Sequence, residues 1–402
     1  MIRDILWMGL HHGVGRGAVF LFFMALPLLL PISTVGEFTF WYTALLLLCQ
    51  PPIDFALSMV IVKATARGDL PTARTALGFG LKVLPAVVAV LWMVTLPASV
   101  PHRLVAWLLL ALGLNLALNL VFAVFRGRED MRVEGIVGSV QKLSILAVLF
   151  GLLTLGLEGS DLPAVSLVGM GVVGWILLLV IFPGRVSSLC RELRAAAPGV
   201  DNGWRLVRQG LALGAVGLVG MLYLRTDVIM LGLISGDEEV GLYFTASRCL
   251  EAAFILPHVV MLAVFPRLAR STELRRDVGR AARWLLALSG MAFTALAATA
   301  FWLLPALYPE LARMSLLLLV MAPAVVPVFL GFLFTQSLVA ADAERRYLIL
   351  AVAGLVLNVA LNLVLIPLLA GVGAAAATVV TETIITVGAM ISLGRCTRPT
   401  AG

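Results

Sequence analysis

The chain has 402 residues, of which 61% are hydrophobic and 13% are charged, and its mean hydropathy is +1.06. A soluble domain of this length must wet its surface, so this composition excludes a soluble enzyme or binding module and predicts an integral membrane protein. The formal charge of +7 does not indicate nucleic acid, because the basic residues lie between the apolar segments.

Apolar segments of about 20 residues recur along the whole chain, which predicts membrane-spanning helices, whereas the alternating pattern of a membrane β-barrel is absent from the sequence. We place about twelve spans near residues 8–31, 38–62, 76–98, 103–125, 134–156, 162–183, 208–234, 239–265, 282–304, 313–338, 348–369 and 371–393. The expected fold class is an all-α polytopic membrane protein with two lobes of six helices each. Four cysteines are scattered without CxxC spacing, so we predict neither disulfides nor a metal site, and no cofactor.

Arginine and lysine residues gather in the loops after even-numbered spans, while the loops after odd-numbered spans are mostly acidic. By the positive-inside rule, both termini are then cytoplasmic. The longest linker contains a short basic helix and divides the chain into an N-terminal lobe (1–183), a cytoplasmic basic linker (184–207) and a C-terminal lobe (208–402). The lobes also show a repeat, because Val35-Gly36 and Val240-Gly241 are each followed seventeen residues later by a proline. Parallel repeats predict a substrate site at their interface.

Charged residues inside the spans are the main functional signal. Arg225 and Arg248 flank a short acidic turn, each about ten residues from it, so at 1.5 Å per residue both lie ~15 Å deep, near the middle of a bilayer. A lone arginine there costs at least ~2.5–3.5 kcal/mol, so two at one depth indicate a water-filled cavity. The candidate substrate-binding cations are Arg16, Lys82, Lys142, Arg225 and Arg248.

The intramembrane acids are candidates for ion coupling or for neutralising these cations. They are Asp54, Asp227, Glu251 and Glu382. Arg248 and Glu251 are three residues apart and are expected to pair on one helix face, and Arg225 is expected to pair less directly with Asp227. Because cations outnumber nearby acids, the predicted cavity favours an anion.

Three stretches, at 33–63, 225–270 and 357–382, resemble bacterial polysaccharide-repeat flippases, the lipid-linked O-antigen exporters. The third stretch holds Asn358, Asn362, Pro367 and a Gly-Ala run in the matching places. These flippases belong to the multidrug/oligosaccharidyl-lipid/polysaccharide exporter superfamily.

The resemblance implies a V-shaped pair of six-helix bundles in the bacterial cytoplasmic (inner) membrane that open alternately to its two sides. It implies a cationic cavity that holds an undecaprenyl-pyrophosphate-linked glycan while the polyprenyl tail stays among the membrane lipids. Candidate partners are the polysaccharide polymerase and glycosyltransferases, with no nucleic acid.

Two other functions stay open at this point. A cation-coupled multidrug antiporter of the same superfamily needs an acidic cavity, for which Asp54 and Glu382 are candidates. A membrane enzyme needs a large catalytic outer loop, yet no predicted outer loop exceeds roughly ten residues and no catalytic motif stands in a fitting context. We therefore expect a transporter and not an enzyme.

Overall fold

The computed structural model describes residues 2–96, 100–157, 159–196, 202–271 and 273–396, and it describes their side chains except at 2–12, 216 and 262. Every regular element in these ranges is helical, as the sequence predicts. The helices are α1 (Ile2–Leu29), α2 (Ile32–Gln50), η1 (Pro51–Leu57), α3 (Ser58–Ala66), α4 (Leu70–Thr95), α5 (His102–Gly127), α6 (Met131–Thr154), α7 (Leu162–Ile181), α8 (Pro183–Ala195), α9 (Gly203–Leu213), α10 (Ala215–Ile234), α11 (Asp237–Ala253), α12 (Ile255–Leu268), α13 (Leu274–Ala298), η2 (Thr299–Leu303), α14 (Leu304–Leu307), α15 (Ala312–Met321), η3 (Ala322–Ala324), α16 (Val325–Ala340), α17 (Glu344–Leu369) and α18 (Gly371–Cys396).

Eleven helical segments among the described residues are long and apolar enough to cross a membrane, and residues 13–29 of α1 add a shorter apolar helix. Helices suit this environment because each satisfies its own backbone hydrogen bonds away from water. The protein is therefore a multi-pass membrane protein, as predicted. The cytoplasmic placement of its termini stays a prediction.

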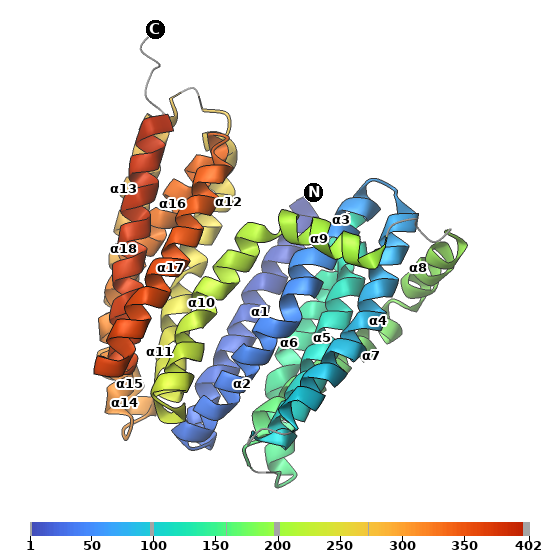
Figure 1. Ribbon diagram of the computed structural model, residues 1–402, viewed down its shortest axis with the longest axis horizontal. Coiled ribbons are helices and arrows are strands. Elements are labelled where there is room, and N and C mark those ends of the chain that lie inside the picture. The colour runs from blue at the N-terminus through green and yellow to red at the C-terminus, as the bar shows by residue number, and fades with distance from the viewer. Residues whose placement is uncertain (1, 97–99, 158, 197–201, 272, 397–402) are drawn as a thin grey trace. The chain divides into compact units, whose positions relative to one another are not determined.

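The helices group into two compact units, and Figure 1 shows the helices of both. Unit 1 contains Met1–Leu30 and Trp41–Leu218, and unit 2 contains Pro31–Phe40 and Val219–Gly402. These edges differ from those of the predicted lobes, because 208–218 pack with unit 1 and 31–40 pack with unit 2. Residues 197–201 of the predicted linker lie outside the described residues.

Unit 1 is built around α5, α6 and α7, with α1 packed along α6 and with α3 and α4 packed along α5. Two consecutive prolines, Pro51 and Pro52, lack backbone N–H groups, and η1 begins at them as a short stretch of wider π-helix between α2 and α3. The short helix α9 lies across the end of this bundle (Figure 1) and packs on η1. Gly210 of α9 allows the close approach, since a Cβ atom there would lie 2.3 Å from the Ala56 carbonyl oxygen.

The amphipathic helix α8 is fixed to unit 1 by polar contacts. Arg128 donates to Glu192 at 2.9 Å, and Arg185 pairs with Asp130 in the turn between α5 and α6. A hydrogen bond from Ser188 and the charge of Arg128 lower the pKa of Glu192. The basic helix predicted from sequence in this linker is thus present as α8 and is anchored by ion pairs.

Unit 2 is built around α16 and α18, with α17 packed along α18, with α12 and α13 packed along α16, and with α11 packed along α15. The first residues of α2 join this unit through a contact between the two motifs matched in the sequence. A Cβ atom on Gly36 would lie 2.9 Å from the Gly241 backbone nitrogen, and one on Gly241 would lie 3.1 Å from the Gly36 nitrogen. The repeated glycines therefore let the α2 and α11 backbones touch.

Candidate functional site

Arg225 on α10 and Arg248 on α11 both contact one carboxylate, that of Glu251. Arg248 Nη2 donates to Glu251 Oε1 at 2.8 Å, and Arg225 Nη1 donates to the same oxygen at 3.4 Å. The Arg248 guanidinium also lies 4.2 Å from the centroid of the Phe244 ring, a cation–π contact. One carboxylate neutralises one cation, so this arginine cluster (Arg225, Arg248 and Glu251) carries a surplus positive charge.

The exposed fractions of these side chains show which groups a ligand can reach. The Arg225 side chain is 21% exposed and Glu251 is 29% exposed, whereas Arg248 is 11% exposed. Each guanidinium has five N–H donors, and the contacts with Glu251 use one donor on each. Donors of Arg225 therefore remain available to an anion.

Asp227 lies two residues beyond Arg225 on α10, but its hydrogen bonds come from neutral side chains. Tyr243 and Thr378 hydroxyls donate to Asp227 Oδ2 at 2.7 and 2.9 Å, and Asn362 Nδ2 donates to Oδ1 at 2.6 Å. The expected pairing of Arg225 with Asp227 is not found among the described residues, since Arg225 contacts Glu251 on the neighbouring helix. Asp227 is 7% exposed and is held by residues from α11, α17 and α18.

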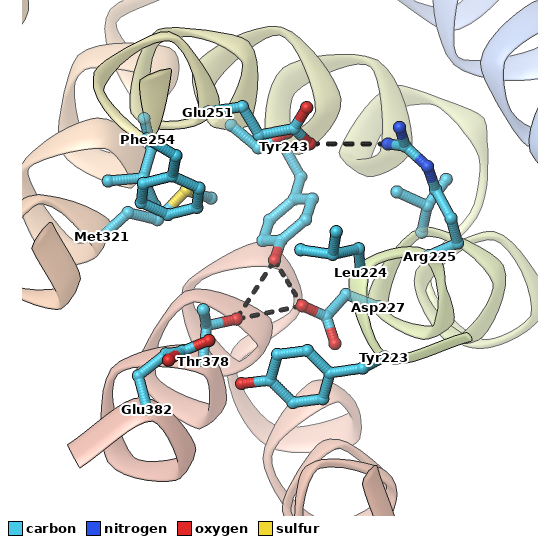
Figure 2. A pocket seen from close by; sticks show the side chains of 13 residues that line it. Tyr223, Leu224, Arg225, Asp227, Tyr243, Glu251, Phe254, Met321, Thr378 and Glu382 are labelled. Carbon is cyan, nitrogen blue, oxygen red and sulfur yellow. Dashed lines mark hydrogen bonds and ion pairs between the residues drawn. The ribbon is translucent and has the colours of Figure 1, made fainter. Parts of the chain in front are cut away.

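A small pocket of about 50 Å³ within unit 2 joins these two groups (Figure 2). Arg225, Glu251 and Asp227 line it together with Glu382, and the Tyr223 ring extends towards the Glu382 carboxyl. A water molecule occupies ~30 Å³ in the liquid, so the pocket has room for one or two waters or one small ion. A larger anion can reach the arginines only from their exposed side.

A second, larger cavity of about 320 Å³ lies within unit 1 and contains Asp54. Gln50 Nε2 donates to Asp54 Oδ2 at 2.8 Å, and Asn119 Nδ2 donates to Oδ1 at 3.1 Å. Two other residues that line the cavity contact each other, since Gln141 Nε2 donates to Asn115 Oδ1 at 2.7 Å. Asp54 projects from η1, so the π-helical turn sets the position of its carboxyl.

Lys142 and Glu134 bring opposite charges to the same cavity. Glu134 forms an ion pair with Arg126, with Oε2 3.1 Å from Nε. Lys142 packs against α1 beside Arg16, since a Cβ atom on Gly15 would lie 3.3 Å from Lys142 Nζ. Arg16 on α1 and Lys82 on α4 are both exposed. Of the five candidate cations, the structure thus joins Arg225 with Arg248 in unit 2 and places Lys142 near Arg16 in unit 1.

Several polar residues of these sites were missed by the sequence analysis as functional candidates. Tyr243 and Thr378 are neutral and are common in membrane helices, so nothing marks them until they are seen to contact Asp227. Asn119 and Gln141 are likewise neutral, and only the packed helices bring them to the cavity of Asp54. A signal for Asn362 did exist, because Asn358 and Asn362 are one turn apart in an otherwise apolar helix.

Comparison with known proteins gives one family and several similar chains. The family described as "Polysaccharide biosynthesis protein" matches residues 1–272. The chain is 23% identical over 261 residues to the "Probable low-salt glycan biosynthesis flippase Agl15" of Haloferax volcanii. That match covers 64% of this chain and 53% of the relative, so the chain spans about half the length of that protein.

Solved structures share the fold over nearly the whole chain. An inward-facing multidrug resistance MATE family transporter of the MOP superfamily has a TM-score of 0.73 at 14% identity, covering 97% of this chain and 96% of that one. The lipid II flippase MurJ, in its inward closed conformation, has a TM-score of 0.73 at 11% identity, covering 98% and 88%. The Vibrio cholerae MATE transporter VcmN, in its bent form, has a TM-score of 0.60 at 15% identity, covering 98% and 93%. At these identities the likeness establishes the fold alone.

Proposed function

Because the chain belongs to the polysaccharide biosynthesis protein family, we propose that it is a flippase for a polyprenyl-pyrophosphate-linked oligosaccharide. The glycan repeat moves from the inner to the outer leaflet of the bacterial cytoplasmic membrane by alternating access, and the two lobes predicted from sequence are the bodies that move. The names of a curated relative and a structural neighbour support this class, since one is a probable glycan biosynthesis flippase and the other a lipid II flippase.

The observation that carries the proposal is the arginine cluster in unit 2. Two guanidiniums share the Glu251 carboxylate, and Arg225 is exposed enough to present its remaining donors. Arginine matches phosphate oxygens with forked donors, and a site partly removed from water strengthens such contacts. We propose that Arg225 and Arg248 bind the pyrophosphate of the substrate from the exposed side of the cluster. Arg16, Lys82 and Lys142 are proposed as further contacts along the substrate's path.

Asp227 is the best candidate for ion coupling. It is a buried carboxylate held by neutral donors, in a pocket whose volume suits a proton carried by water or a small cation. Glu382 lines the same pocket, and the arginine cluster lies beside it. A change of charge at Asp227 would therefore act directly on the helices that present Arg225 and Arg248. Asp54, in unit 1, is a second candidate.

A cation-coupled multidrug antiporter is the alternative, favoured by the fold shared with MATE transporters. A cationic drug needs accessible acidic groups. Asp227 is closed off by three donors, and Glu251 is engaged by two arginines. Neither carboxylate is thus open to a cationic drug, whereas Arg225 keeps donors for an anion on the exposed side of the cluster.

Deletion of the gene tests the proposal. The deletion strain should accumulate a lipid-linked oligosaccharide on the inner leaflet and lose the corresponding surface glycan, while its sensitivity to cationic drugs stays unchanged. Surface glycan at the normal level together with increased sensitivity to cationic drugs would contradict the flippase and support the antiporter.

A further inference from the structure

The cavity in unit 1 has polar groups that no neighbour uses. The side-chain amide oxygens of Gln50, Asn119 and Gln141 accept no hydrogen bond within the part of the chain that the structure describes. None of the three oxygens is closed off from water. The amide nitrogens of the same residues are already engaged by Asp54 and Asn115, which fixes the direction in which the free oxygens point.

One wall of the same cavity is aromatic. The Phe23 and Tyr42 rings lie 6.1 Å apart between centroids and are tilted by 50°. The cavity volume of about 320 Å³ lies at the lower end of the range for small-molecule sites. It therefore has room for one ring-sized group against the aromatic wall.

The cavity is lined by charges of both signs. Because the carboxylates of Asp54 and Glu134 lie on the same lining as the ammonium of Lys142, neither an anionic nor a cationic ring-sized group is favoured at every wall. An acyl chain would leave the free amide oxygens without partners, at ~1–3 kcal/mol for each buried group. A neutral polyol satisfies the acceptors, because each hydroxyl both donates and accepts.

From this juxtaposition of fixed amide acceptors and an aromatic wall, we infer that the unit 1 cavity is a subsite for a single neutral sugar residue of the transported glycan. The sugar hydroxyls donate to Gln50, Asn119 and Gln141, while the C–H face of its ring packs on the Phe23–Tyr42 wall. This inference rests on the proposed function, and it assigns recognition of the glycan to unit 1 and recognition of the pyrophosphate to the arginine cluster of unit 2.

The test compares two lipids on the purified full-length protein in nanodiscs. One is bare polyprenyl diphosphate, and the other is the same lipid carrying the host's glycan, purified from the deletion strain. The wild type should bind the glycan-bearing lipid at least tenfold more tightly. Ala111 lies on the cavity wall, so Ala111→Met fills the cavity and should abolish that preference while binding of the bare lipid is retained. Ala117→Met is the matched control, since Ala117 is on the same helix but does not line the cavity.

Gln50→Ala provides a second, independent test, because it removes the free amide oxygen of Gln50 without adding bulk to the cavity. It should lower the preference several-fold, and it decides the question if Ala111→Met fails to fold. The sugar subsite is overturned if the folded variants keep the preference for the glycan-bearing lipid, or if the wild type binds both lipids equally. Either result leaves the flippase proposal intact. A wild type that binds neither lipid contradicts the flippase proposal itself, and the subsite with it.

Discussion

Removal of Glu251 should destabilise the protein more than removal of either arginine. Glu251→Ala leaves two largely buried guanidiniums without the carboxylate that both contact. Arg225→Ala removes the longer contact, of 3.4 Å, and leaves the pair between Arg248 and Glu251 at 2.8 Å. Arg248→Ala removes the shorter contact and the cation–π contact with Phe244, but Glu251 keeps Arg225.

The sizes of these effects follow from burial. Removing one partner of a buried ion pair costs ~3–5 kcal/mol, and the 29% exposure of Glu251 places its loss near the lower end of that range. Arg225→Ala should cost only about 1 kcal/mol, because the lost contact is long and partly exposed. Arg248→Ala should fall between the two. The triple variant changes Arg225, Arg248 and Glu251 to alanine together. It leaves no charge of the cluster without a partner, so it should regain most of the stability that Glu251→Ala loses.

Measurements of stability and of export distinguish a structural role of the arginine cluster from a role in binding the substrate. Thermal unfolding of the purified variants measures the order of stability, and surface glycan at matched protein levels measures export. If the arginines bind pyrophosphate, the triple variant should be folded and inactive, and Arg248→Lys should keep part of the export because a point charge remains without the bidentate fork. Export at the wild-type level by the triple variant would refute the role of both arginines in substrate binding.

Three further predictions follow from other parts of the molecule. Asp227→Asn should abolish the dependence of export on an ion gradient while the lipid-linked glycan still binds, and unchanged gradient dependence would leave Asp227 a structural residue. In a background without the four native cysteines, a cysteine at Glu238 should react with an impermeant reagent outside intact cells and one at Ala343 should not, whereas the opposite labelling would reverse the topology. Gly210→Val should displace α9 from η1, because a Cβ atom there would lie 2.3 Å from the Ala56 carbonyl oxygen. The purified variant should therefore unfold at a lower temperature than the wild type. An unchanged unfolding temperature would contradict this packing.

The sequence alone determined the class of protein and much of its helical layout. Its composition and the length of its apolar segments require membrane helices, because backbone groups in lipid must be satisfied within the segment. The pairing of Arg248 with Glu251 was also predictable, because residues three apart on a helix lie on one face whatever surrounds them. The shared depth of Arg225 and Arg248 followed from counting residues from the turn, and the Glu251 contact agrees with it.

Only the tertiary structure decided which groups from distant helices meet. Asp227 contacts Asn362 and Thr378, which are 135 and 151 residues away, and no local rule fixes such distances. The contact between Gly36 and Gly241 and the free amide oxygens in the unit 1 cavity likewise depend on how whole helices pack. Periodicity and spacing fix the face of a helix on which a residue lies. The partner of that residue depends on the neighbouring helix and on how the two helices are rotated about their axes. For this reason Arg225 pairs with Glu251 and not with Asp227.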